Sequence, residues 1–120
     1  MFRPWPNPAT KRSLEQGRRV RGVPSPSLAD ALTVPEPGSN TFPIIQSLVE
    51  DVLLVSESEI AATIRLLALE QKLVVEAGGA VSVAAAVSWR ESDDELPLVC
   101  VVSGGNIDPG QLRSILQGSQ

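Results

Sequence analysis

The sequence contains no histidine and no tyrosine, a single cysteine, and only two phenylalanines and two tryptophans among its 120 residues. Without histidine, the usual general base, His–Cys catalysis and His-ligated metal sites are all excluded. Cys100 has no partner for an internal disulfide, and its apolar neighbours favour a buried, inert thiol over a nucleophile. This cysteine usage is typical of the reducing cytoplasm, where we expect the protein to be.

Long apolar runs are also missing. No stretch approaches the roughly 20 apolar residues that span a membrane, so we expect no membrane partner. The prolines at positions 4, 6 and 8 and the lack of an apolar core argue against a signal peptide. A chain of this length supports one small domain, which we assign to residues 1–120.

The charge is unevenly distributed. Residues 1–22 contain six basic residues and one acidic residue, a net charge of +5, which leaves −9 for the remainder of a chain whose total is −4. A basic segment can indicate nucleic-acid binding. This one has no repeat and no recognised module, so a solvated basic surface is favoured and no nucleic-acid partner is expected.

The most informative stretch joins an apolar run to a glycine loop. Residues 98–102 are apolar and β-branched, the segment Ser103-Gly104-Gly105-Asn106 follows, and Asp108-Pro109 then begins a helical pattern. The pattern predicts a strand over 98–103 that is buried on both faces, followed by a loop and a helix. Ligands of open α/β sheets bind at the carboxyl ends of strands, so this loop is either a ligand site or a tight turn without a ligand.

The rest of the chain alternates between helical and extended patterns, which predicts an α/β fold. Glu76, which precedes a glycine pair, is a helix cap, a solvated edge residue or a pocket carboxylate. A proline-rich loop over 23–40 is long enough to indicate a functional loop or a missing partner. The other expected elements are a helix over 8–17, a helix with Thr41 as its N-cap, a helix over about 57–72 (with a Ser56–Glu59 capping box), and strands over 18–22 and 51–55. The apolar run over 81–89 is compatible with a helix or a strand, and its alanines favour a helix.

Several short motifs occur in the order seen in one enzyme family. They are Thr41-Phe42-Pro43-Ile44-Ile45, Val55-Ser56-Glu57-Ser58-Glu59-Ile60, Lys72-Leu73-Val74-Val75-Glu76, Gly79-Ala80 and Ser103-Gly104-Gly105-Asn106-Ile107-Asp108. In these the chain resembles the serine/threonine dehydratases, pyridoxal-phosphate enzymes of the tryptophan-synthase β-like fold to which serine racemase also belongs. The similarity covers about residues 3 to 117.

The resemblance implies a fold, a cofactor and site residues. It implies the C-terminal portion of a three-layer α/β/α domain, and an activity that converts threonine or serine to a 2-oxo acid and ammonia. By the same resemblance, Ser103 would hydrogen-bond the pyridine nitrogen of pyridoxal 5'-phosphate. Gly104, Gly105 and Asn106 would shape the loop, and Glu76 would lie near the cofactor.

The departures from the family concern its catalytic parts. Lys11 and Lys72 are the only lysines, and neither lies in the Ser-x-Lys-x-Arg-Gly context of the family's Schiff-base lysine. The glycine-rich phosphate loop is absent, Ala31 occupies a usual glycine, and Arg3 replaces the glutamate that binds a divalent cation in some members, so we expect no metal.

These departures predict a chain without a catalytic residue of its own. We expect no activity from the chain alone, and action on an amino-acid substrate only if an N-terminal half complements it. The alternative is a non-catalytic binding or oligomerisation module derived from the family. In either case, exposed strand edges and apolar faces predict self-association.

Overall fold

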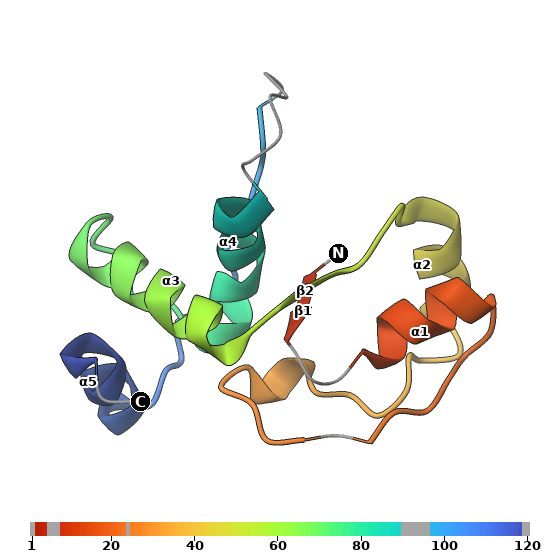
Figure 1. Ribbon diagram of the computed structural model, residues 1–120, viewed down its shortest axis with the longest axis horizontal. Helices are drawn as coiled ribbons and strands as arrows, with labels where there is room; N and C mark the ends of the chain where they lie inside the picture. Colours follow the sequence, from red (N-terminus) through yellow and green to blue (C-terminus); the bar gives the residue numbers. More distant parts are fainter. Residues whose placement is uncertain (1, 5–7, 24, 90–96, 119–120) are drawn as a thin grey trace.

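A computed structural model describes residues 2–4, 8–23, 25–89 and 97–118, with residues 2–4 described by their backbone only. At its centre is a two-stranded parallel sheet (Figure 1). Strand β1 (Phe2–Pro4) pairs with strand β2 (Leu53–Val55). In this register Phe2 lies opposite Leu53 and Pro4 opposite Val55. The chain therefore joins its beginning to its middle through a crossover, as parallel pairing requires.

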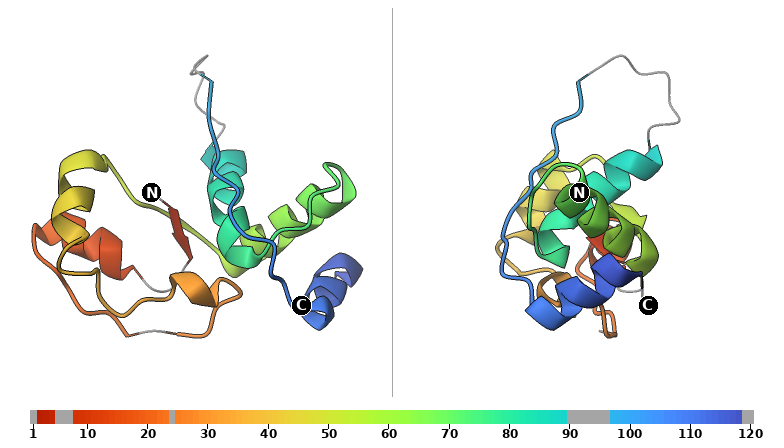
Figure 2. Two further views of the ribbon diagram at one scale, coloured as in Figure 1. Left: turned by 180° about the vertical axis from the view of Figure 1, so that it is seen from behind. Right: turned by 90° about the vertical axis from the view of Figure 1, so that its left-hand side faces the viewer.

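Two short helices lie side by side on one flank of the sheet (Figures 1 and 2). Helix α1 (Ala9–Gln16) ends at Gly17, whose φ of 64° is the left-handed conformation that glycine adopts without strain. Helix α2 (Phe42–Leu48) carries proline in its first turn and buries Phe42. The loop between these helices contains a single 3-10 turn, η1 (Asp30–Leu32).

Three helices form the other flank. Helix α3 (Glu57–Leu69) begins with the expected capping box, in which Ser56 and Glu59 exchange hydrogen bonds. Helix α4 (Ala77–Trp89) packs across α3, and its alanines and glycines permit this close approach. Helix α5 (Pro109–Gln117) is capped by the Asp108 side chain and packs on α3.

The main hydrophobic core lies between α3 and α4 and extends to β2 and α5. Ile60 and Ile64 on α3 are completely buried, and Ala80 and Ala84 on α4 are almost completely so. Ile115 anchors α5 to the same cluster. Because these side chains are aliphatic and small, the core depends on close helix packing and not on large aromatic groups.

The predicted strand over 98–103 is wrong for this chain. No strand is assigned anywhere in the described segment 97–108, and Val99 and Val101 are 84% and 73% exposed instead of buried. The segment runs along α4, where the Ser82 hydroxyl donates to the Val101 carbonyl at 2.7 Å. A strand needs a neighbouring strand to pair its backbone N–H and C=O groups, and the described residues place none beside this segment.

Three further details of the chain differ from the predictions made from its sequence. The strand expected over 18–22 is also not formed, because the described backbone there has no ladder partner. Cys100 is half-buried and not fully buried, with its thiol 3.7 Å from the Ser82 carbonyl. Thr41 occupies the N-cap position of α2, but its hydroxyl donates back to Gly38 and caps nothing.

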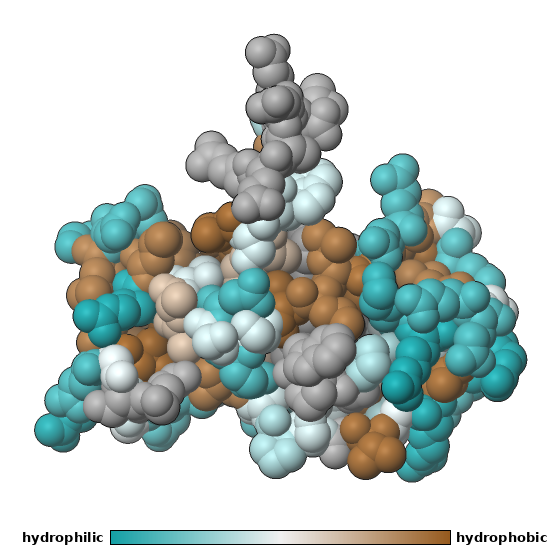
Figure 3. Space-filling view, viewed as in Figure 1, coloured by the Kyte–Doolittle hydropathy of each residue, from teal (hydrophilic) through white to brown (hydrophobic). Residues whose placement is uncertain are grey.

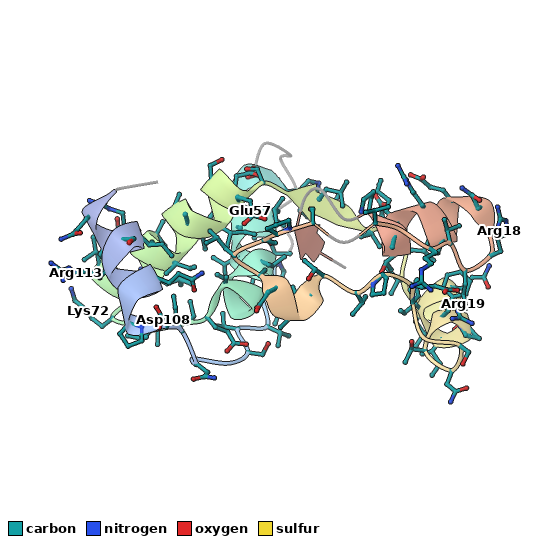
Figure 4. The ribbon with its side chains drawn as sticks, turned by 90° about the horizontal axis from the view of Figure 1, so that it is seen from below. Arg18, Arg19, Glu57, Lys72, Asp108 and Arg113 are labelled. Atoms are coloured by element: carbon teal, nitrogen blue, oxygen red, sulfur yellow. The ribbon has the colours of Figure 1, made fainter. Side chains whose placement is uncertain are left out.

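Part of the basic segment 1–22, residues 1 and 5–7, falls outside the described residues. Within the described part, Lys11 forms a salt bridge with Asp51 at 3.1 Å, and Arg19 forms one with Glu36 at 3.0 Å. Figure 4 shows Arg18 and Arg19 at the end of the molecule opposite Arg113.

Among the described residues, no helix is both long and apolar enough to cross a membrane.

Candidate functional site

A cavity of about 340 Å³ lies where three distant segments of the chain meet. The η1 loop, the start of α4 and the segment leading into α5 each form one wall. Its volume falls in the range typical of small-molecule sites. The lining residues are Leu28, Asp30, Ala31, Glu76, Ala77, Gly78, Asn106, Ile107 and Gln111.

Glu76 connects two of these walls. Its backbone N–H donates to the Gly104 carbonyl at 3.2 Å, and its carboxylate accepts the Asn106 backbone N–H at 3.1 Å. Its own carbonyl accepts the N–H groups of Gly79 and Ala80 at 3.0 and 3.1 Å, which starts helix α4. Of the roles that the sequence left open, Glu76 therefore combines two: its backbone begins a helix, and its side chain lines a cavity.

Two glycines allow the loop to approach this closely. A Cβ on Gly79 would lie 2.1 Å from the Ser103 carbonyl oxygen, so the first turn of α4 is packed directly on the loop backbone. Gly104 has a φ of +80°, and a Cβ there would lie 2.5 Å from a Glu76 carboxylate oxygen. Both positions therefore exclude any side chain, for steric reasons that involve the candidate site itself.

The loop residues predicted from sequence are brought together, but only one of them lines the cavity. Asn106 is part of the wall, whereas Ser103, Gly104 and Gly105 lie next to it, behind Glu76 and the start of α4. Ser103 is exposed, and among the described residues its hydroxyl has no hydrogen-bond partner. A hydroxyl in this state is free to donate to a ligand.

The wall formed by the η1 loop is attached to α3 through one carboxylate. Glu57 accepts the Ser27 hydroxyl at 2.6 Å and the Leu28 N–H at 2.7 Å. On the cavity side of this loop, Asp30 accepts the N–H of Ala31 at 2.7 Å. These bonds hold the η1 loop in a fixed position against the cavity.

The electrostatic character of the cavity is acidic. Among the described residues, its lining contains two carboxylates, Asp30 and Glu76, and no lysine or arginine. Such a wall disfavours a phosphate group, which would be placed beside two negative charges without a compensating cation among the described lining residues.

Both lysines lie outside the cavity lining. The Lys11 ammonium group binds Asp51 and the Val52 carbonyl. Lys72 has a φ of 59° and donates to the Leu69 carbonyl at the end of α3. Among the described residues there is also no cluster of three carboxylate or thiol groups that could hold a metal ion.

Sequence reasoning missed several lining residues. Leu28, Asp30 and Ala31 come from the loop over 23–40, whose length indicated either a functional loop or a missing partner but no particular residue as part of a cavity. Gly78 lines the cavity with space beside it, since a Cβ there would meet nothing closer than 3.7 Å. Gln111 had no sequence signal, because nothing in one helical turn indicates that it faces a cavity.

Residues 3–104 match the family described as pyridoxal-phosphate dependent enzyme. The chain is 48% identical to the L-threonine ammonia-lyase of Geobacter sulfurreducens over 110 residues, and 37% identical to that of Thermotoga maritima over 109 residues. The alignments cover 92% and 91% of this chain but only 27% of each relative. The chain thus spans about a quarter of the length of these relatives.

Solved structures show the same fold. A threonine deaminase from T.th. superposes with a TM-score of 0.82 at 37% identity, over 89% of this chain and 38% of that one. Maize serine racemase superposes with a TM-score of 0.83 at 26% identity, over 97% of this chain and 36% of that one. The expected partial α/β fold of this class is therefore confirmed.

Proposed function

The chain belongs to the pyridoxal-phosphate dependent enzymes, and from this premise we propose that it supplies the pyridine end of the cofactor site in a threonine or serine ammonia-lyase. The observation that carries the proposal is that Glu76, Asn106 and the η1 loop line one cavity, with Ser103 and Gly104 next to the residues that line it. The named relatives are L-threonine ammonia-lyases, which supports this reaction class over others in the family.

The residues present fit one end of the cofactor. When bound, pyridoxal 5'-phosphate supplies an electron sink that stabilises negative charge at the substrate's α-carbon. The exposed Ser103 hydroxyl is free to donate to a ring nitrogen, as the resemblance implies. The acidic lining of the cavity is compatible with the ring and not with the phosphate. We therefore assign the ring end of the site, and not the phosphate end, to this chain.

A hydroxyl at position 103, instead of a carboxylate, affects whether a bound ring nitrogen would be protonated. Ser103 can hydrogen-bond a ring nitrogen without keeping it protonated, whereas a carboxylate would stabilise the protonated form. A ring bound in this way would be a weaker electron sink, which would suit loss of the substrate's β-hydroxyl group as water, the reaction of an ammonia-lyase acting on threonine or serine.

The chain alone is proposed to be inactive. Neither Lys11 nor Lys72 lines the cavity, so no described amine is available to bind the cofactor aldehyde or to accept the α-proton. In this proposal, a second polypeptide with the lysine and the phosphate loop completes the site.

A second candidate function is a non-catalytic oligomerisation module, and exposed apolar surface favours it. Val99 and Val101 in the segment after α4 are 84% and 73% exposed, and Leu73 and Val74 before α4 are 49% and 57% exposed. Figure 3 shows apolar side chains exposed around the central elements, whereas the flank of α1 and α2 is mostly hydrophilic. Surface of this kind is typical of protein interfaces.

Complementation distinguishes the two candidates. The chain would be mixed with a polypeptide that covers the part of the Geobacter sulfurreducens relative outside the aligned region, and 2-oxo acid formation from L-threonine and L-serine would be measured with pyridoxal 5'-phosphate. The proposal predicts activity only in the mixture, and its loss when the second polypeptide has its lysine replaced. A mixture that forms a stable complex without activity would favour the oligomerisation module.

A further inference from the structure

The backbone of the Ser103–Asn106 loop is held by one residue. Among the described residues, this loop makes two backbone hydrogen bonds, and both go to Glu76: one from the Glu76 N–H to Gly104, and one from Asn106 to the Glu76 carboxylate. Ser103 itself contributes no hydrogen bond to holding the loop in place. The conformation that presents its hydroxyl therefore depends on Glu76.

We propose that Glu76 is a positioning residue that locks the loop and thereby fixes the Ser103 hydroxyl, and that it does not itself contact the cofactor through the locking oxygen. This inference rests on the proposed function only for what Ser103 binds. That Glu76 holds the loop is inferred from its hydrogen bonds to Gly104 and Asn106 within the chain.

Steric contact reinforces the hydrogen bonds. The Glu76 carboxylate lies directly over the Cα of Gly104, so that a Cβ there would come within 2.5 Å of one oxygen and 2.9 Å of the other. The carboxylate thus fills the space that a side chain at position 104 would occupy. The glycine and the acid are complementary: each has the size that the other requires.

The hydrogen bond from Asn106 to Glu76, which we call the lock, requires an acceptor at position 76 and not a negative charge. Asn106 donates a backbone N–H, which a carboxylate or a side-chain amide oxygen can accept. Glu76→Gln therefore preserves the lock, whereas Glu76→Ala removes it. This separates positioning from a role in which the negative charge acts on a bound ring, because the charge-removing variant would then fail as well.

Amide exchange of Asn106 in the full chain tests the lock without any cofactor. Magnetisation-transfer NMR would compare the wild type with Glu76→Ala, Glu76→Gln and the exposed control Glu50→Ala. We expect exchange at Asn106 to be faster by about tenfold in Glu76→Ala, and to stay within about twofold of the wild type in Glu76→Gln and in the control. Unchanged exchange in Glu76→Ala, or equal acceleration in Glu76→Gln, would overturn the proposal.

A second measurement covers the case in which Glu76→Ala unfolds the start of α4. Gly104→Ala would be made in the wild type and in the Glu76→Gln and Glu76→Ala backgrounds, with thermal unfolding as the readout. We expect Gly104→Ala to lower the melting temperature less in the Glu76→Ala background, because the steric conflict is gone. Equal losses in all backgrounds would contradict the lock. Failure of complementation with an intact lock would count against the proposed function alone.

Discussion

The Ser27 hydroxyl donates a 2.6 Å hydrogen bond to the carboxylate of Glu57, thirty positions away along the chain. This single contact joins the irregular loop before η1 to the first turn of α3, where a carboxylate is also favoured by the helix dipole. Because the same carboxylate accepts the Leu28 N–H, the wall of the cavity and the start of the helix are coupled.

The first prediction concerns that coupling. Glu57→Ala removes two hydrogen bonds and a favourable charge at the helix start, so we expect the unfolding free energy to fall by about 1–3 kcal/mol. Urea unfolding measures this, with exposed Glu50→Ala as the control. Exchange at the Leu28 amide should rise in Glu57→Ala alone. A stability equal to that of the control would show that the loop is held by other contacts.

Two adjacent glycines in α4 give opposite predictions. Gly79→Ala places a Cβ 2.1 Å from the Ser103 carbonyl oxygen, so we expect a loss of about 1–3 kcal/mol as the loop is pushed away. Gly78→Ala meets nothing closer than 3.7 Å and should stabilise the chain by about 0.4–1 kcal/mol, because alanine loses less backbone entropy in a helix. The melting temperatures of both variants, compared with that of the wild type, test these predictions. Similar effects at the two positions would contradict the packing of α4 on the loop.

The pH dependence of stability should depend in part on Glu59. Hydrogen bonds from the Ser56 backbone N–H, the Ser88 hydroxyl and the Ser56 hydroxyl lower the pKa of Glu59 below its ordinary value of 4.5. Because the folded pKa is depressed, the stabilisation is present above pH 4.5 and is lost as the pH falls through the folded pKa. The stability advantage of the wild type over Glu59→Gln should therefore shrink on acidification, as measured by melting temperatures between pH 6 and about pH 3. A constant advantage would refute this assignment.

Self-association should depend on the exposed segment after α4. Val99 is 84% exposed, and Val23, in the loop between α1 and η1, is 88% exposed and serves as a matched control. We expect Val99→Lys to shift the chain toward monomer in sedimentation velocity, because a charge on an unpaired apolar segment opposes strand addition. Val23→Lys should leave the distribution unchanged. A wild-type chain that is monomeric at all concentrations would remove the second candidate function.

Local sequence signals predicted most of the helices correctly. The Ser56–Glu59 capping box and the Asp108–Pro109 helix start were both confirmed, because each needs only a few neighbouring residues. The alanine-rich run over 81–89 is helical as expected, and the helix begins four residues earlier, at Ala77. In contrast, residues 98–103 have strand composition but form no strand, since pairing is a long-range interaction that composition cannot provide.

The candidate site was predicted only in part. The assignment of the Ser103–Asn106 loop and Glu76 to a cofactor site stays a prediction from the sequence. The sequence could not predict the hydrogen bonds that join them, which depend on how α4 crosses the loop. Asp30 and Ala31 could be assigned to a functional loop and not to a cavity wall. The family resemblance added the cofactor, which no spacing of residues in this chain could have identified by itself.

The central proposal is that this chain provides one wall of the cofactor site and no lysine that binds the cofactor covalently. Borohydride reduction of the chain with pyridoxal 5'-phosphate, followed by mass spectrometry of Lys11 and Lys72, tests this directly, and Ser103→Ala serves as the control. The account predicts weak, non-saturable labelling of both lysines that is unchanged in Ser103→Ala. Saturable one-to-one labelling of either lysine, reduced by Ser103→Ala, would contradict it.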